Sequence, residues 1–126
     1  MIPLISFSQY TAIQDQNFEQ ALIDLGHDDV IDGQVLTANI SSVTQLVLRD
    51  QNISDLTGIE DFTDLTYLDC EINGLTSLDL SQNTALTYLQ CDDNQLTILG
   101  VSQNTALQTL ECGNNQLTSL DVSQNT

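Results

Sequence analysis

Positive charge is almost absent from this sequence. Its 126 residues include one Arg and no Lys against 18 Asp and Glu, which gives a formal net charge of -17 at pH 7. Proteins that bind nucleic acid rely on Lys and Arg to neutralise phosphates, and anionic membrane surfaces attract basic segments for the same reason. We therefore expect no nucleic-acid partner and no attraction to an anionic membrane surface.

Aromatic residues and long apolar runs are also scarce. Aromatic side chains make up 5% of the chain, Trp is missing, and the hydrophobic content is 40%. A membrane-spanning helix needs about 20 apolar residues, which no part of the sequence approaches, so we expect no membrane insertion. The core of one domain of this size must be built from Leu, Ile and Val, which suits thin and regular layers.

The residues that would support catalysis or metal binding are equally few. His27 is the only imidazole in the chain, and a Ser or Cys nucleophile needs a base beside it. A metal site at the cysteines would lack a nearby His ligand. We expect no enzymatic activity, no cofactor and no metal site.

The first eight residues, MIPLISFS, form an apolar run that ends in small residues before Gln9. This composition is typical of the end of a secretory signal peptide that lacks its basic start. An apolar strand that caps the domain is the alternative, because the run is short for a complete signal-peptide core. We interpret residues 1–8 as a signal-peptide remnant.

The second half of the chain repeats itself with a period of 21 residues. Residues 65–85, 86–106 and 107–126 align without a gap, and each ends in or just after the phrase SQNT. An upstream unit at residues 43–64 fits the same template with one extra residue. Such a period predicts a solenoid, in which each unit buries its apolar edge against its neighbours.

Each unit contains a second, shorter repetition. Both halves follow the pattern LxxLx(C/L/V)xxN, and the second half begins 10 residues after the first. Alternating inward residues predict a short strand, and the Asn closes a corner. We therefore predict a flattened coil with a parallel sheet on both sides.

The pattern resembles the leucine-rich-repeat family, whose strand motif is LxxLxLxxNxL. The nested form with period 21 is similar to the IRREKO class of bacterial leucine-rich repeats, and the unit at residues 43–64 resembles an internalin repeat. This resemblance implies a secreted or cell-surface bacterial solenoid. It further implies an extracellular, non-catalytic module for binding or adhesion, with a protein or glycan as its partner.

Residues 9–42 resemble the N-terminal cap of internalin-like proteins. The segment NFEQALIDLG predicts a short helix over about residues 17–25, capped by Asn17 and ended by Gly26. Its apolar stripe comprises Phe18, Ala21, Leu22 and Leu25. The segment VLTANI, residues 35–40, predicts a bridging strand.

Cysteines and asparagines recur at the repeat period. Cys70, Cys91 and Cys112 occupy a position that holds Leu or Val in the other half-repeats, so we interpret them as inward-facing free thiols that act as small hydrophobes. Two columns of Asn are predicted to bond backbone groups at the corners of each coil. These columns are Asn73, Asn94 and Asn115, and Asn83, Asn104 and Asn125.

The outward side chains of the first half-repeats carry the strongest functional signal. Tyr67 and Tyr88 fall in one column beside acidic residues, and tyrosine is a favoured anchor at protein interfaces. Acidic neighbours would select and steer a basic or polar partner, whereas the alternative is cross-strand packing on a solvated sheet. The predicted partner-binding face comprises Arg49, Tyr67, Asp69, Glu71, Tyr88, Gln90, Asp92, Thr109 and Glu111.

The second half-repeats present a different set of outward residues. They are Ser77 and Asp79, Ile98 and Gly100, and Ser119 and Asp121, with Thr76, Thr97 and Thr118 in register beside them. Threonine ladders on flat solenoids raise ice binding as a third function. The interleaved acids interrupt such a surface and disfavour it.

The segment HDDVIDG, residues 27–33, places Asp28, Asp29 and Asp32 before a Gly, as calcium loops do. An EF-hand takes oxygen ligands at alternate positions, and Val30 stands at one of them, so a solvated turn of the cap is favoured. A calcium site would support the alternative function, an acidic and calcium-responsive structural spacer or accessory domain of a larger extracellular protein.

The chain stops at Thr126, at the end of the third SQNT and one residue short of a full repeat. Solenoids need a polar cap at each end, and no C-terminal cap follows here. We expect end-to-end self-association through the apolar edge of the last coil, or a chain that was part of a longer protein.

Overall fold

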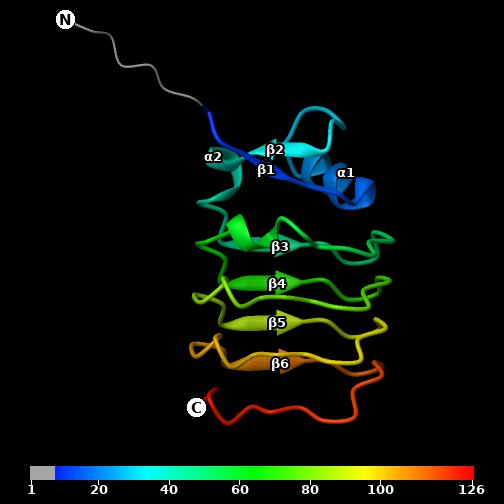
Figure 1. Cartoon of the computed structure of the whole chain (residues 1–126), viewed down its shortest axis with the longest axis vertical. Helices are drawn as coiled ribbons and strands as arrows, with labels where there is room; N and C mark the ends of the chain where they lie inside the picture. The colour runs from blue at the N-terminus through cyan, green and yellow to red at the C-terminus, as the bar shows by residue number, and fades with distance from the viewer. Residues whose placement is uncertain (1–7) are drawn as a thin grey trace, which may run out of the picture.

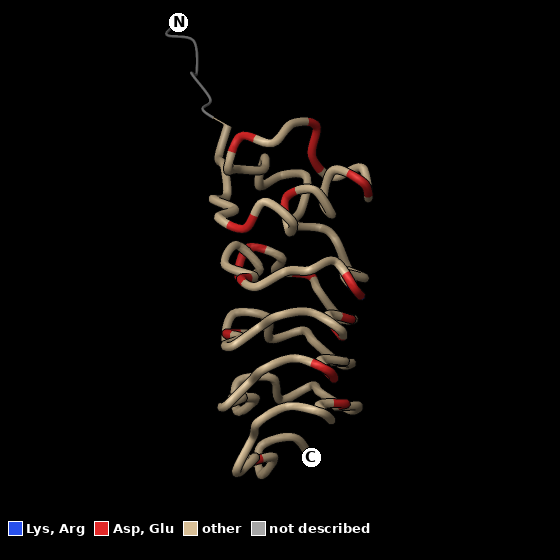
Figure 2. The backbone as a smooth tube through the Cα atoms, turned by 90° about the vertical axis from the view of Figure 1, so that its right-hand side faces the viewer, with Lys and Arg blue, Asp and Glu red and all other residues tan. Residues whose placement is uncertain are grey.

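The computed structural model describes residues 8–126, so the predicted signal-peptide remnant lies outside the described residues except for Ser8. The chain forms a solenoid of stacked coils beneath an N-terminal cap (Figure 1), and acidic residues occur along the whole stack (Figure 2). No helix among residues 8–126 is long and apolar enough to cross a membrane. The elements are β1 (Tyr10–Ala12), α1 (Gln16–Asp24), β2 (Gln34–Leu36), α2 (Thr37–Ile40), β3 (Gln45–Val47), the 3-10 turn η1 (Ile59–Asp61), β4 (Tyr67–Asp69), β5 (Tyr88–Gln90) and β6 (Thr109–Glu111).

One side of the coils is a parallel sheet in the order β3-β4-β5-β6. The strands are in register, so that the central Leu of each strand lies beside the next, from Leu46 through Leu68 and Leu89 to Leu110. The first three of these side chains are fully buried. Because alternate residues of a strand point to opposite faces, the residues on either side of each Leu face outward in straight columns.

The second side of the coils carries no strand within residues 43–126, so the prediction of strands on both sides is wrong. Neighbouring coils share single backbone bonds where this side begins, as from Gly74 N to Ile53 O (2.8 Å). Further along this side, backbone N–H groups form hydrogen bonds within local turns. For example, the Asp79 carboxylate accepts hydrogen bonds from Ser81 N (3.0 Å) and Ser81 Oγ (2.7 Å). A side chain that captures a backbone N–H removes it from a ladder.

Helix α1 has a different cap from the one predicted. Asp15, not Asn17, is the N-cap, and its Oδ1 accepts hydrogen bonds from Asn17 N (2.9 Å) and Phe18 N (3.1 Å). The Oδ2 atom of the same carboxylate accepts from Ser54 N (2.8 Å), Ser54 Oγ (3.1 Å) and Asp55 N (3.0 Å). One carboxylate therefore caps the helix and ties it to the first coil.

The apolar face of α1 packs over the top of the solenoid. Phe18, Ala21 and Leu22 are buried, and the Phe18 ring stacks on Phe62 of the first coil at a centroid distance of 6.3 Å. Leu25 is 46% exposed, so the predicted stripe is one residue too long. Leu25 is the C-cap, where the helix ends and its face turns away from the core.

The segment at residues 35–40 is only partly a strand. β2 pairs with β1 as an antiparallel two-stranded sheet, whereas Thr37–Ile40 forms the helical turn α2 and corrects the predicted bridging strand. The turn buries Ile40 completely, and the hydroxyl of Thr37 hydrogen-bonds that of Thr11 (2.8 Å). Tertiary packing thus overrides the local β propensity of the sequence.

A buried carboxylate organises the loop at residues 27–33. Glu19 is fully buried, and its Oε1 accepts hydrogen bonds from Asp32 N (2.9 Å), Gly33 N (2.9 Å) and Gln34 N (3.3 Å). The backbone of the acidic loop is therefore closed onto α1 by a protein carboxylate. Within residues 8–126 no group of three or more His, Cys, Asp and Glu side chains is placed to hold a metal ion.

The first corner of each coil requires a left-handed backbone. Asp50, Ile72, Asp93 and Asn114 have φ angles of 55°, 55°, 54° and 51°. Asn and Asp tolerate this conformation, but a β-branched residue such as Ile is an outlier there. The coil that contains Ile72 therefore carries local backbone strain that the coils above and below avoid.

Replacement of Asp15 by Ala should lower the free energy of unfolding by about 2 kcal/mol, because the helix cap and the bonds to the first coil are lost together. Burial alone would raise the pKa of Asp15, but hydrogen bonds from Ser54, Phe18 and Asp55 lower it below its ordinary value. The variant should therefore lose the full amount of stability at pH values above the ordinary pKa of Asp, and lose less as the pH falls through the lowered pKa of Asp15. Urea unfolding at several pH values measures this loss of stability. The matched control is Asp64→Ala, since Asp64 is exposed. Equal stability of the two variants would contradict the capping role of Asp15.

Replacement of Ile72 by Asn should raise the free energy of unfolding by roughly 1 kcal/mol, because it relieves the left-handed strain. Urea unfolding of the variant is the measurement. The control is Val30→Asn, since Val30 is an exposed aliphatic residue outside the left-handed corners. A variant at residue 72 that is no more stable than the parent protein would show that the corner is unstrained.

Candidate functional site

The outward columns of the sheet bring the predicted partner-binding residues onto one surface. Tyr67 pairs with Tyr88 and Tyr88 with Thr109, while Asp69, Gln90 and Glu111 form the next column. A third column follows the strands and contains Arg49, Glu71 and Asp92. We refer to these nine residues together as the tyrosine face.

The two tyrosine rings are stacked on one another. Their centroids are 4.5 Å apart and their planes differ by 10°. The hydroxyl of Tyr88 donates a hydrogen bond to Glu111 Oε1 (3.0 Å), and this bond is the main reason that the pKa of Tyr88 is raised. The stack is thus tied to the neighbouring strand through Glu111.

Arg49 and Glu71 form an ion pair at the edge of the face. Glu71 is 5% exposed, and its side chain also accepts a hydrogen bond from Gln90 Nε2. A carboxylate that is nearly buried needs such partners, because desolvation of an unpaired charge is costly. The single basic side chain of the sequence is therefore already committed to one carboxylate.

The remaining acids of the face are not neutralised. Asp69 is 7% exposed, and its Oδ1 accepts a hydrogen bond from Glu71 N (3.1 Å). Burial raises the pKa of Asp69; the nearby Arg49 opposes that shift, and the charge of Asp92 adds to it. Asp92 Oδ1 accepts from Gly113 N (2.8 Å), while its Oδ2 is shielded from solvent and has no hydrogen-bond partner. A cationic group would relieve both carboxylates.

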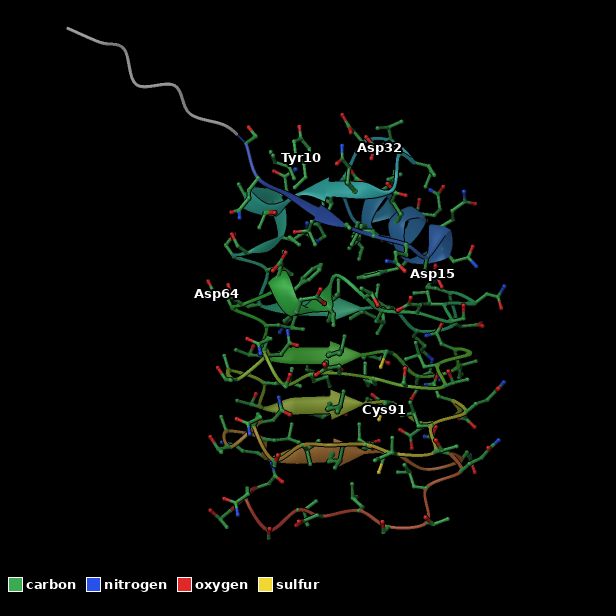
Figure 3. The ribbon with its side chains drawn as sticks, viewed as in Figure 1. Tyr10, Asp15, Asp32, Asp64 and Cys91 are labelled. Atoms are coloured by element: carbon green, nitrogen blue, oxygen red, sulfur yellow. The ribbon has the colours of Figure 1, made fainter. Side chains whose placement is uncertain are left out.

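The three cysteines lie one behind the other just past the strands. Cys70 and Cys91 are buried free thiols and Cys112 is half-buried; Cys91 is labelled in Figure 3. Burial raises the pKa of Cys70 well above its ordinary value and that of Cys91 to about 12. Thiols with such pKa values stay protonated at neutral pH and are poor nucleophiles.

The first Asn column bonds each coil to the one above it. Asn73 Nδ2 donates to Leu48 O in the preceding coil (2.8 Å) and to Cys70 O in its own coil (3.0 Å), and Asn73 Oδ1 accepts from Ile53 N (2.9 Å). Asn94 and Asn115 repeat this arrangement one and two coils further on.

The second Asn column, at the SQNT corners, makes a similar but less complete set of bonds. Asn83 Nδ2 donates to Ile59 O (2.9 Å) and Phe62 O (3.2 Å), and Asn104 and Asn125 donate to the coils before them. The Oδ1 atoms of Asn83, Asn104 and Asn125 are shielded from solvent without a hydrogen-bond partner. At these corners the Asn side chain therefore donates hydrogen bonds through Nδ2 but accepts none through Oδ1.

Two carboxylates that hold the cap were missed by the sequence analysis. Asp15 lies between the cap and the first coil (Figure 3), and Glu19 is buried in α1. Asp15 could have been found as an alternative N-cap two residues before Asn17. For Glu19 the only signal is an acidic residue adjacent to the apolar stripe, which is common on solvated helices.

No family model matches the chain. A stretch of 45 residues is 49% identical to internalin J of Listeria monocytogenes serotype 4b (strain F2365), which covers 36% of this chain and 5% of that protein. The solved functional domain of InlJ from Listeria monocytogenes is 40% identical over 97% of this chain, with a TM-score of 0.84. The chain is an internalin-like leucine-rich-repeat protein.

A second solved structure, the internalin InlF of Listeria monocytogenes, shares the solenoid fold with this internalin-like chain at 23% identity over 90% of its length and a TM-score of 0.80. The chain spans 28% of the solved InlJ chain and 33% of the solved InlF chain. The InlJ domain is described as including a cysteine ladder, and Cys70, Cys91 and Cys112 lie at corresponding positions of successive coils here.

Replacement of Asp69 by Asn should stabilise the protein at neutral pH. A carboxyl group whose pKa is raised by folding contributes most to the stability of the folded protein below its ordinary pKa. That stability is lost as the pH rises through the raised pKa. Asn keeps an acceptor for Glu71 N and carries no charge. We expect a higher Tm than the parent protein at pH 7 and a difference that vanishes near pH 3, measured by circular dichroism. A difference that does not change with pH would contradict the raised pKa.

Proposed function

We propose that this internalin-like solenoid is a secreted or cell-surface module, without catalytic activity, that binds a basic segment of a partner protein through the tyrosine face. The likeness to internalins supports a protein-binding or adhesion-type module. The protonated thiols and the single imidazole of the sequence favour recognition over chemistry. The Tyr67–Tyr88 stack above unneutralised carboxylates is the observation that carries the proposal.

The stack is suited to be a rigid anchor. Each ring covers one face of the other at 4.5 Å, so little side-chain entropy remains to be lost on binding. Stacked rings also leave one outer face each, which suits an Arg guanidinium better than a sugar that must lie across a broad aromatic platform. This geometry favours a protein partner over the glycan partner that the family resemblance left open.

The charges of the face define the chemistry of the partner. Glu71 is paired with Arg49, whereas Asp92 Oδ2 lacks a partner and Glu111 is exposed. A Lys or Arg that reaches Asp92 would donate a charge-assisted hydrogen bond to a partly desolvated carboxylate. The net charge of -17 would also speed the approach of a basic partner, in a manner that salt weakens.

Removal of the stack provides the test. Immobilised wild-type protein and the double variant Tyr67→Ala with Tyr88→Ala are used to capture partners from cell-surface extracts, and affinities for the captured protein are measured by calorimetry. We expect at least about a tenfold loss of affinity, as for aromatic hot spots elsewhere. Tyr10→Ala is the matched control, because the third tyrosine of the chain is 55% exposed and lies on β1 of the cap.

Capture of the same partner at the same affinity by both proteins would show that the tyrosine face is the wrong surface. Capture of a glycan instead of a protein would correct the partner class. Thermal melts with calcium chloride and with EDTA address the alternative of a calcium-responsive spacer, which predicts a rise of Tm in calcium through ligand linkage.

A further inference from the structure

One coil departs from the repeat on the second side of the solenoid. The outward pair in the second half-repeat is Ser77 and Asp79 in one coil, Ser119 and Asp121 two coils later, and Ile98 and Gly100 in the coil between them. The departure replaces a polar side chain by a large apolar one and removes a carboxylate. It lies in the middle of an otherwise close repeat, where packing demands are the same in each coil.

Neither packing nor backbone geometry explains this pair. Ile98 is 73% exposed, more than any other large hydrophobic residue among those described. Gly100 does not have a positive φ, and a Cβ atom built on it meets nothing within 4 Å. The backbone would therefore accept Asp at position 100 as readily as it does at position 79. The reason for the pair Ile98 and Gly100 must then lie in the surface that they expose.

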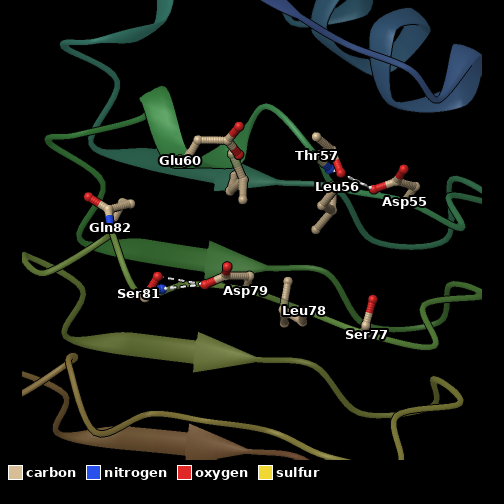
Figure 4. A pocket seen from close by; sticks show the side chains of 10 residues that line it. Asp55, Leu56, Thr57, Glu60, Ser77, Leu78, Asp79, Ser81 and Gln82 are labelled. Atoms are coloured by element: carbon tan, nitrogen blue, oxygen red, sulfur yellow. Dashed lines mark hydrogen bonds between the residues drawn. The ribbon is translucent and has the colours of Figure 1, made fainter.

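The pair lies at one end of a groove that crosses three coils. A hollow of about 360 Å³ is lined by Asp55, Glu60 and Asp79 around Leu78 (Figure 4). A second hollow of about 330 Å³ continues from it, shares Leu78 and Asp79, and is lined by Ile98 and Gly100. We refer to the two hollows together as the second-side groove.

The groove is acidic at one end and apolar at the other. Hydrogen bonds from the hydroxyl and the N–H of Ser81 lower the pKa of Asp79, which keeps that carboxylate charged well below neutral pH. The only Arg of the sequence, Arg49, is on the opposite side of the coil in an ion pair with Glu71. A second copy of this chain is a poor occupant, because two chains of charge -17 repel one another.

We propose that the second-side groove docks an extended basic segment of a partner protein, with an apolar side chain against Ile98 and a Lys or Arg beside Asp55, Glu60 and Asp79. Charge complementarity selects the basic residue, and the exposed Ile98 selects the apolar one. Coils stack about 5 Å apart and an extended chain advances about 3.3 Å per residue. Asp55 and Glu60 lie two coils before Ile98, a distance of about 10 Å, so the apolar and basic residues should be separated by about three positions. This groove is distinct from the tyrosine face, and the proposal does not depend on binding at the tyrosine face.

The test uses the whole chain with methyl-labelled Ile and acetylated, amidated hexapeptides as probes. The peptide LGSKKG carries both features, SGSKKG lacks the apolar anchor, and LGSEEG lacks the basic residues. We expect a saturable shift of the Ile98 methyl resonance with LGSKKG at millimolar concentration. The other two peptides should bind at least about fivefold more weakly, since each lacks one contact.

Two variants test the groove itself. Ile98→Ser with Gly100→Asp restores the pair found in the neighbouring coils, so it should fold, and it should weaken LGSKKG binding at least about tenfold when a second resonance of the groove is followed. Asp79→Asn keeps an acceptor for Ser81 and should reduce the preference for LGSKKG over LGSEEG. Val30→Ser removes an exposed aliphatic residue of the cap and should leave binding unchanged.

Three outcomes would overturn the proposal. The first is no saturable shift at Ile98 with any peptide. The second is undiminished binding by the folded Ile98→Ser, Gly100→Asp variant. The third is a shift at Ile98 that depends on protein concentration in the absence of peptide, because it would assign the groove to a second copy of the chain.

Discussion

Donation from one Asn side chain at each corner to carbonyl groups of the preceding coil is the interaction on which the solenoid depends. Asn73 reaches Leu48 O, and Asn104 reaches Leu80 O, across the boundary between coils. These bonds satisfy backbone groups that the turns would otherwise leave buried and unpaired. Because the same atoms are bonded in each coil, the coils stack in one register, and that register brings Tyr67 onto Tyr88 and Cys70 behind Cys91.

The regular stack brings carboxylates close together in a chain with almost no positive charge. Columns of like residues place carboxylates one coil apart, where they repel each other. Nearby ion-pair and hydrogen-bond partners offset this repulsion for individual carboxylates. Glu71 takes Arg49 and Gln90 as partners, Asp79 takes Ser81, and Asp15 takes Ser54. Asp69 and Asp92 are less well compensated. These uncompensated acids beside the stacked tyrosines are the basis of the proposal that the tyrosine face binds a cationic partner.

Much of the architecture could be read from the repeat. The period of 21 residues, the inward Leu positions and the outward columns follow from alternation along a strand and need no knowledge of long-range contacts. The strands expected on the second side did not form, and in two of these coils Asp79 and Asp121 instead accept hydrogen bonds from Ser81 N and Ser123 N in local turns. The predicted helix cap, Asn17, was also wrong. The sequence shows which residues can cap a helix, but not that Asp15 also accepts a hydrogen bond from Ser54 N of the first coil.

The sequence by itself determined the solenoid, its pitch in residues and the identity of the residues on each face, because these depend on periodicity alone. Tertiary structure decided which of those residues act together. The stacking of two tyrosine rings, the burial of Asp69 and Glu71, the closure of the acidic loop by Glu19 and the groove beside Ile98 all arise between segments 13 or more residues apart. Such contacts depend on the spacing and tilt of neighbouring coils, which the packed core sets and local sequence does not encode.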